Sequence, residues 1–300
     1  MLLSATRLSP CPSLLGESPL WDAANECLYW VDGAGCRIHR HDLARNSFTE
    51  WKLPSMVGSV GLSGGRRLIA GLSDGIYEFD TETSDLRAIF KLPGADARVR
   101  FNDGKVDRQG RFLCGTMGVQ ADARGELYRV SADGGVEVLA NGIRISNALC
   151  FSPDGGTMYF ADSLDLNVRA YRYSPGPEPL AQPRVLVDTR PYGSGPDGAT
   201  VDAEGCIWIA MVQSGKIARF TPDGQLDRLI DAPIDIPSCV AFGGPDMSTL
   251  YLTSIRDSGT GRAVSRHPAG GHLFAIEGLG VRGIPETRFG QPQPEHGEQP

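Results

Sequence analysis

Residues 25–32 read NECLYWVD, and this pattern of a turn followed by a short apolar strand recurs five more times along the chain. The later copies are GRRLIAGL (65–72), GRFLCGTM (110–117), GTMYFADS (156–163), GCIWIAMV (205–212) and STLYLTSI (248–255). Counted between Tyr29, Leu68, Phe112, Tyr159, Trp208 and Tyr251, the steps are 39, 44, 47, 49 and 43 residues. A period of about 40 to 50 residues is typical of the four-stranded blades of a β-propeller.

The segments between the repeats favour an all-β chain. Turn dipeptides such as Asp74-Gly75 and Asp154-Gly155 separate short alternating apolar segments, and stretches with a helical period are hard to find. One such unit alone would leave an apolar face and two edges in water, whereas six units packed radially bury those faces. We therefore expect one six-bladed β-propeller domain over residues 1–288, in preference to two β-sandwiches with coincidental spacing.

The two ends of the chain have separate expected roles. The last predicted strand, GHLFAI, ends at Ile276 and leaves room for few further strands, so residues 1–15 are expected to supply a strand to the last blade. The polar, proline-rich segment 289–300 is expected to be a flexible tail.

The composition excludes several classes of function. The chain has 300 residues, 41% hydrophobic and 22% charged, which predicts a globular protein rather than a disordered one. No apolar run is long enough to span a membrane, and Arg7 and Pro10 interrupt any signal peptide, so a cytoplasmic protein is expected. A net charge of −7 argues against nucleic acid or membrane partners. The seven cysteines form no CxxC pair and are expected to be reduced and mostly buried.

One phase of the repeat is rich in oxygen donors. The residues that stand 10 to 13 positions before the six residues used above to count the period are Glu17, Met56, Asn102, Asn147, Asp197 and Ser238. The inner strands of a propeller line its central channel, so residues at one phase converge at the mouth of that channel. Buried carboxylates and amides without partners cost about 1 to 3 kcal/mol each, so four of them together predict a bound divalent cation.

Oxygen donors alone suit Ca²⁺, Mg²⁺ or Mn²⁺, while Zn²⁺ and Fe²⁺ also stay open. About three protein ligands would leave coordination positions for water and a substrate oxygen, as in a catalytic site. The alternative is that these Asn and Asp residues are merely turn and strand-end residues. That simpler interpretation is preferred for the aspartates of the outer turns, which are Asp22, Asp107, Asp154, Asp202 and Asp223.

Five ordered motifs make the chain resemble the SMP-30/gluconolactonase family, which includes regucalcin-like proteins and bacterial sugar lactonases. The motifs are GESPLWD (16–22), RFNDGKVDRQGRFLCGTM (100–117), ISNALCFSPDGGTMYFAD (145–162), PDGATVDAEGCIWIA (196–210) and FGGPDMSTLYLTS (242–254). The resemblance implies a six-bladed propeller with one divalent metal ion at the channel mouth and hydrolysis of aldonolactones.

The resemblance also implies roles for single residues. The metal ligands of the family fall on Glu17, Asn147 and Asp197, and its substrate-contacting Arg and Asn fall on Arg100 and Asn102. Gln120 stands near the position where some animal members have a substrate-contacting Glu. We therefore expect Gln120 to be a substrate-binding residue, in a loop (118–124) that shapes specificity.

These roles lead to a hypothesis for the reaction. The cation would act as a Lewis acid and water activator, Asp197 would accept the proton of the water, and Arg100 with Asn102 would position a sugar lactone. Hydrolysis of other lactones, esters or organophosphates at the same site is one alternative, and a non-catalytic calcium-binding propeller is another. The sequence leaves the lactone, the metal and the oligomeric state open.

Competing sites are weak. His39 and His41 are expected on the solvated face of an outer strand rather than as metal ligands. The GxSxG pattern of serine hydrolases at residues 61–65 lacks its strand-to-helix context.

Overall fold

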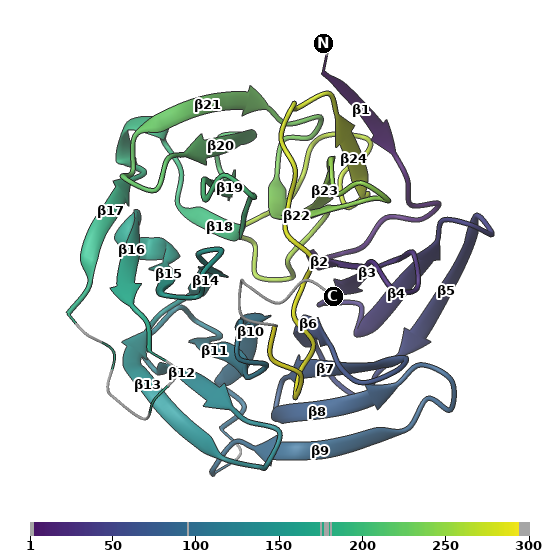
Figure 1. Ribbon diagram of the computed structural model, residues 1–300, viewed down its shortest axis with the longest axis vertical. Coiled ribbons are helices and arrows are strands. Elements are labelled where there is room, and N and C mark those ends of the chain that lie inside the picture. The colour runs from purple at the N-terminus through teal and green to yellow at the C-terminus, as the bar shows by residue number, and fades with distance from the viewer. Residues whose placement is uncertain (1–2, 95, 175, 177–179, 181, 294–300) are drawn as a thin grey trace.

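The computed structural model describes residues 3–94, 96–174, 176, 180 and 182–293, and in them six four-stranded antiparallel sheets form a ring (Figure 1). Blade 1 contains β2 (Gly16–Asp22), β3 (Cys27–Asp32), β4 (Arg37–Asp42) and β5 (Ser47–Lys52). Blade 2 contains β6 (Val57–Leu62), β7 (Arg67–Leu72), β8 (Gly75–Asp80) and β9 (Leu86–Lys91). Blade 3 contains β10 (Val99–Val106), β11 (Phe112–Gly118), β12 (Gly125–Val130) and β13 (Val136–Ile143).

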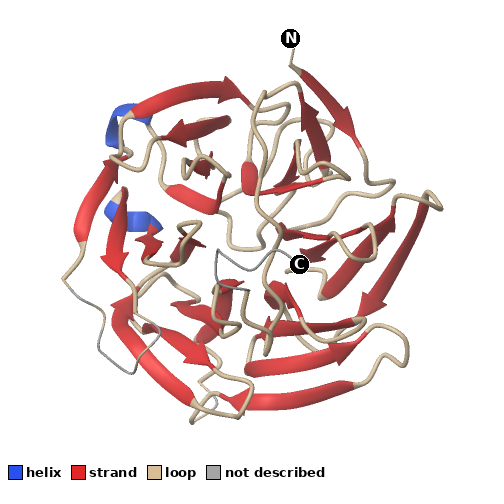
Figure 2. Cartoon of the chain, viewed as in Figure 1, coloured by secondary structure: helices blue, strands red, loops and turns tan. Residues whose placement is uncertain are grey.

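Blade 4 contains β14 (Ser146–Phe151), β15 (Thr157–Asp162), β16 (Asn167–Arg172) and β17 (Arg184–Asp188). Blade 5 contains β18 (Pro196–Val201), β19 (Ile207–Met211), β20 (Lys216–Phe220) and β21 (Leu226–Asp231). Blade 6 contains β22 (Pro237–Gly243), β23 (Thr249–Ser254), β24 (Phe274–Glu277) and β1 (Ser4–Arg7). Two short 3₁₀ helices lie in connections between strands, η1 (Ser163–Asp165) between β15 and β16 and η2 (Arg190–Tyr192) between β17 and β18 (Figure 2). The predicted all-β, six-bladed propeller is confirmed.

The described residues contain no helix of the length and apolar character that crossing a membrane requires.

The first strand of the chain closes the ring. β1 pairs antiparallel with β24, with Ser4 opposite Glu277 and Arg7 opposite Phe274. In Figure 1 the purple β1 accordingly lies beside the yellow-green β24 at the outer side of blade 6. The expected contribution of residues 1–15 to the last blade is therefore confirmed, while the boundaries of a single domain over residues 1–288 stay a prediction.

Burial decreases from the inner to the outer strand of a blade. Every residue of the inner strands β14 and β18 is buried, whereas the outer strands β5 and β21 alternate between exposed and half-buried side chains. The apolar side chains form clusters between neighbouring blades, such as the one in which Ala148 and Tyr159 of blade 4 pack with Ile209 and Phe220 of blade 5. Each blade is therefore stabilised by burying both faces against its neighbours.

All seven cysteines are free, and five of them are buried, in agreement with the sequence. The expected solvated face for His39 and His41 is wrong in the case of His41, which is only 6% exposed. Its ring stacks on Phe48 with centroids 4.1 Å apart, and the ring of His39 stacks on Trp30. The aromatic neighbours of both rings explain their burial without a metal ion.

The C-terminal segment crosses the ring on its way to the chain end, and Figure 1 shows it in yellow over the inner strands. The amide of Gly283 bonds to the carbonyl of Met247 in blade 6, and that of Phe289 bonds to Leu62 in blade 2. The Phe289 side chain is buried between blades 2 and 3. Residues 289–293 of the expected flexible tail are therefore packed on the propeller, and residues 294–300 lie outside the described residues.

Candidate active site

A cavity of about 470 Å³ at one end of the central channel gathers five of the six residues expected from the sequence. Its lining includes Glu17 from β2, Arg100 and Asn102 from β10, Asn147 from β14 and Asp197 from β18. Four separate blades therefore contribute to one site.

Two residues at the same phase of the repeat do not line the cavity, namely Met56 and Ser238. Ser238 is fully buried, and its hydroxyl donates to the carbonyl oxygen of Gly16 at 2.5 Å. This serine therefore links blade 6 to blade 1 instead of serving the cavity.

β-bulges direct the site residues toward the channel. Each inner strand shifts register against its neighbour, for example between Glu17 and Leu20 and between Asn147 and Cys150. Ser18, which follows Glu17, has a φ of 50°. A left-handed residue and a bulge re-aim the adjacent side chains, and both features are frequent beside functional sites.

Gly198 has a different role after Asp197. A Cβ atom at this position would lie 2.1 Å from Sγ of Cys239. Only glycine therefore lets β18 approach β22 closely enough to hold Asp197 in the cavity.

A chain of hydrogen bonds fixes both amides of the site. Arg100 Nη1 donates to Asn102 Oδ1 at 2.7 Å, and Asn102 Nδ2 donates to Asn147 Oδ1 at 3.0 Å and to the carbonyl of Ser146 at 2.8 Å. Asn147 Nδ2 donates to Ser163 Oγ at 2.8 Å, and that hydroxyl donates to the carbonyl of Pro196 at 2.7 Å. The amide of Asn147 is therefore held with one lone pair of Oδ1 still available.

The carboxyl groups in and beside the cavity repel one another. Burial raises the pKa of Glu17 well above its ordinary value, and the charges of Asp197 and Asp103 raise it further. Burial and Asp103 likewise raise the pKa of Asp197, and burial raises the pKa of Asp103 to about 6. Within the described ranges, neither Glu17 nor Asp197 is in a salt bridge with a basic side chain.

The positive charge of Arg100 acts on both Glu17 and Asp197 and partly offsets the rise of their pKa values. Burial lowers the pKa of its guanidinium to about 10, against the opposing influence of Glu17 and Asp197. Its single charge leaves one negative charge of the two carboxylates uncompensated.

This donor set fits a divalent cation. Among the residues that the structure describes, no group of three or more His, Cys, Asp or Glu side chains is placed to hold a metal ion. A cation in this cavity would therefore require an amide oxygen as third donor, and Asn147 Oδ1 can supply it from an amide that is held in place. Oxygen donors of this kind suit hard divalent ions.

Gln120 is not brought to the cavity. Its side chain is exposed, and its backbone carbonyl accepts a hydrogen bond from Nη2 of Arg262 at 2.7 Å. Arg262 does line the cavity, so the loop containing Gln120 reaches the site indirectly.

Sequence reasoning missed seven other polar residues of the lining, which are Ser163, Gln213, Asp235, Ser258, Thr260, Arg262 and Arg266. Ser163 begins η1, and the two arginines lie in the connection between β23 and β24. None of them lies at the repeat phase that identified the oxygen donors, so the period gave no signal for them.

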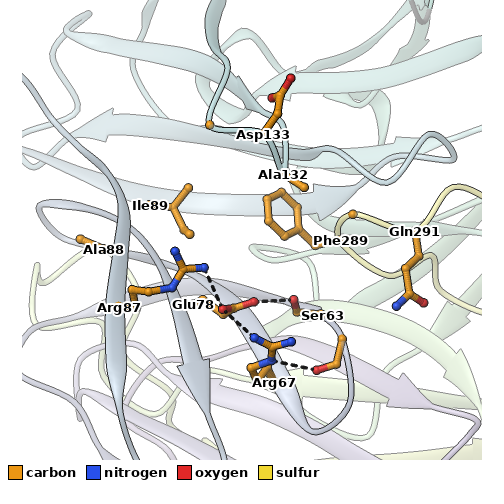
Figure 3. Close-up of a pocket in the computed structure, with 13 residues that line it drawn as sticks. Ser63, Arg67, Glu78, Arg87, Ala88, Ile89, Ala132, Asp133, Phe289 and Gln291 are labelled. Atoms are coloured by element: carbon orange, nitrogen blue, oxygen red, sulfur yellow. Dashed lines mark hydrogen bonds and ion pairs between the residues drawn. The ribbon is translucent and has the colours of Figure 1, made fainter.

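A second cavity, of about 400 Å³, lies between blades 2 and 3 beside the C-terminal segment (Figure 3). Its buried carboxylate, Glu78, accepts hydrogen bonds from Ser63 at 2.9 Å, Arg67 at 3.2 Å and Arg87 at 3.0 Å. These bonds satisfy the charge of Glu78, so among the described residues this cavity has no buried carboxylate without a basic partner.

Comparisons with known proteins extend over the whole propeller. A profile of the family described as "SMP-30/Gluconolactonase/LRE-like region" matches residues 15–256. The 6-deoxy-6-sulfogluconolactonase of Pseudomonas putida is 37% identical over 281 residues, covering 93% of this chain and 96% of that protein. Regucalcin of Xenopus laevis is 32% identical, covering 92% and 94%. A crystal structure of a calcium-binding protein, regucalcin, from Agrobacterium tumefaciens superposes with a TM-score of 0.87 at 30% identity, covering 96% and 97%.

Proposed function

Because the chain belongs to the SMP-30/gluconolactonase/LRE-like family, we propose that it is a lactonase that hydrolyses a sugar lactone to the aldonic acid. The observation that carries this proposal is the convergence of Glu17, Asn147 and Asp197 with Arg100 in one cavity. Its volume of about 470 Å³ lies in the range of small-molecule sites. A relative that is 37% identical is named for lactonase activity on a sugar lactone.

Glu17, Asn147 and Asp197 would hold one divalent cation, which is calcium, zinc, manganese, magnesium or ferrous iron. The mutual repulsion of the two carboxyl groups supports this assignment, since a doubly charged ion would offset it. When bound, such an ion polarises the lactone carbonyl and lowers the pKa of a water molecule. Asn147 would contribute Oδ1, because its Nδ2 is committed to Ser163.

Asp197 would accept the proton of the attacking water at a carboxylate oxygen and return it to the ring oxygen when the acyl C–O bond of the lactone breaks. The position of Asp197 supports this role, since the carboxylate lines the cavity and has no salt bridge with a basic side chain among the described residues. A general base must lie within hydrogen-bond reach of the proton that it takes.

Arg100 and Asn102 position the substrate. Arg100 uses Nη1 for the bonds to Asn102 and to the carbonyl of Phe101, which leaves Nε and Nη2 for oxygens of the sugar. Oδ1 and Nδ2 of Asn102 both already have protein partners. Asn102 therefore acts chiefly by holding Arg100 and Asn147 in place, with one lone pair of its Oδ1 left for a sugar hydroxyl.

A pH-stat assay tests the proposal. We expect acid release from D-glucono-1,5-lactone above the uncatalysed rate, loss of this release after chelation, and recovery on adding back one divalent cation. Aryl esters and phosphotriesters, assayed in parallel, test the alternative substrates. Faster turnover of a phosphotriester than of any aldonolactone would contradict the proposal.

The second candidate is a calcium-binding propeller without catalysis, which the name of the similar Agrobacterium protein favours. Such a module would bind calcium in the same cavity but release no acid from any lactone. The unused donors of Arg100 argue for a substrate, because they serve no purpose in binding a cation.

A further inference from the structure

A single long connection, between β23 and β24, contributes two arginines to the lining of the cavity. Arg262 and Arg266 line the candidate active site, and both lie between Ser254, the end of β23, and Phe274, the start of β24. In blades 1 and 2 the corresponding connections between the second and third strands are short turns. The long connection of blade 6 therefore adds side chains to the site that the regular blades do not provide.

Contacts at both ends hold this connection over the cavity. At its base, the two carboxylate oxygens of Asp235 accept hydrogen bonds from Ser265 Oγ at 2.5 Å and from the amide of Arg266 at 2.8 Å. At its tip, Arg262 Nη2 donates to the carbonyl of Gln120 in blade 3, on the opposite side of the ring. The connection thus reaches across the mouth of the channel.

Among the described residues, neither arginine has a counter-ion. Throughout the part of the chain that the structure describes, no carboxylate forms a salt bridge with Arg262 or Arg266. Asp235, an acidic residue of the lining, already accepts two hydrogen bonds from the connection. Arg262 also binds a carbonyl, which carries no net charge, so both arginines are exposed residues of the lining whose charge no described carboxylate pairs with.

We infer that the lactone taken by this site carries an anionic group at the end remote from its carbonyl, and that Arg262 and Arg266 bind this group. Sulfonate, phosphate and carboxylate share the required chemistry of several acceptor oxygens with a negative charge. The inference rests on the proposed lactonase function and makes its substrate class more specific. The carboxylates and the positioning Arg100 would meet the lactone end, and the two arginines of the connection would meet the other end.

Steady-state kinetics test this assignment. The substrates are D-glucono-1,5-lactone, which is neutral, and three anionic lactones, namely 6-phosphogluconolactone, 6-deoxy-6-sulfogluconolactone and glucarolactone. We expect a higher kcat/KM for at least one anionic lactone than for the neutral one. In the double variant Arg262→Gln/Arg266→Gln, kcat/KM for the anionic lactone should fall about 10- to 100-fold, since hydrogen bonds to charged groups are lost. The rate with the neutral lactone should change by less than about threefold.

Two further variants control for charge and for folding. Arg256→Gln removes one exposed positive charge from the same connection at a residue that does not line the cavity, so it should change neither rate. Arg266→Gln alone keeps the bond between Arg262 and Gln120, and it should retain part of the preference for the anionic lactone. Equal losses with neutral and anionic lactones in the double variant would overturn the inference and leave the lactonase proposal standing.

A binding measurement separates the two proposals if no lactone is hydrolysed. Calorimetry would then compare 6-phosphogluconate with gluconate as ligands of the wild-type protein and the double variant. Preference for 6-phosphogluconate that disappears in the double variant would support the anion site even though the lactonase proposal had failed. Equal affinity for the two acids would overturn the anion site as well.

Discussion

At the scale of single residues, the two carboxylates of the cavity have opposite effects on stability and function. Burial and mutual repulsion raise the pKa values of Glu17 and Asp197, so both groups destabilise the metal-free fold when they are ionised. Residues that cost stability in this way are common at functional sites.

We expect Asp197→Asn and Glu17→Gln to lower the lactonase kcat by about 100-fold or more, because each removes a charged ligand and Asp197 also supplies the base. The urea midpoint of the metal-free variants should equal or exceed that of the wild type, since one of two repelling charges is gone. The matched control is Asp223→Asn, the same change in an exposed outer turn. Wild-type turnover in Asp197→Asn would contradict the mechanism.

Ser163 acts through Asn147 rather than on the substrate. Its hydroxyl accepts from Asn147 Nδ2 and donates to the carbonyl of Pro196, which fixes the amide orientation. Outer partners of metal ligands typically change metal affinity about 10- to 100-fold when they are removed.

We therefore expect Ser163→Ala to weaken binding of a divalent cation about tenfold, as measured by calorimetry on the metal-free protein. Ser163→Thr keeps the hydroxyl and should restore most of the affinity. If Ser163→Ala binds the cation as tightly as the wild type, then Ser163 does not orient Asn147.

The sequence located those site residues that share the repeat phase. Glu17, Asn102, Asn147 and Asp197 all line the cavity, because this phase of four of the six blades contributes to it. Gln120 does not line it, since only its carbonyl turns toward the site. The positions of such loop residues depend on contacts between distant blades, which local sequence patterns do not record.

At the scale of secondary structure, alternation and turn residues predicted the strands but not their irregularities. The β-bulge between Asn147 and Cys150 has no sequence signature, because the residue that follows Asn147 in the left-handed region is Ala148 rather than glycine. The outer aspartates were predicted as turn residues, and Asp202 indeed accepts the amides of Glu204 and Cys206. Its additional hydrogen bond from Arg219 of β20 joins two strands and could not be inferred locally.

His272 makes the closure of the ring sensitive to acid. Its Nδ1 lies 3.0 Å from the carbonyl oxygen of Ser9, and burial lowers its pKa below the ordinary 6.5. Between that lowered pKa and 6.5, the unfolded chain binds a proton at this position that the folded chain does not. Stability contributed by neutral His272 is therefore complete above pH 6.5 and is lost as the pH falls through this window.

We expect the contribution of His272 to the free energy of unfolding to fall with decreasing pH below 6.5, by at most about 1.4 kcal/mol per pH unit. Urea unfolding at several pH values measures the effect. His272→Gln should reduce the slope, whereas His267→Gln, at an exposed position of the same connection, should not. An identical slope in His272→Gln and the wild type would show that other groups are responsible.

At the scale of the whole molecule, the sequence repeat predicted the number of blades, and the shortage of strands after Ile276 predicted that the N-terminal segment closes the ring. The path of the C-terminal segment could not be predicted, because its contacts involve single residues from several blades. Phe289 is the one bulky apolar side chain in the segment expected to be a tail, and it fills a space between blades 2 and 3. The polar composition of the segment predicted flexibility, because a composition describes the segment as a whole and does not show that one apolar residue holds it in place.

An ion pair joins the C-terminal segment to an inner strand. Lys105 Nζ of β10 lies 2.6 Å from Glu286 Oε1, and the two side chains are 17% and 8% exposed. Burial alone would lower the pKa of Lys105, but the charge of Glu286 raises it. Breaking a buried pair by removing one partner costs about 3–5 kcal/mol, because the remaining charge is left without compensation.

Glu286→Gln should therefore lower the free energy of unfolding by about 3 kcal/mol, while the apolar double variant Lys105→Met/Glu286→Leu should lose much less. Glu277→Gln, at the exposed end of β24, is the control for removing a carboxylate. If the double variant is as unstable as Glu286→Gln, then packing rather than charge holds the segment. Because Lys105 and Arg100 lie on the same strand, a loosened segment should also raise the KM for the lactone, although Glu286 does not line the cavity.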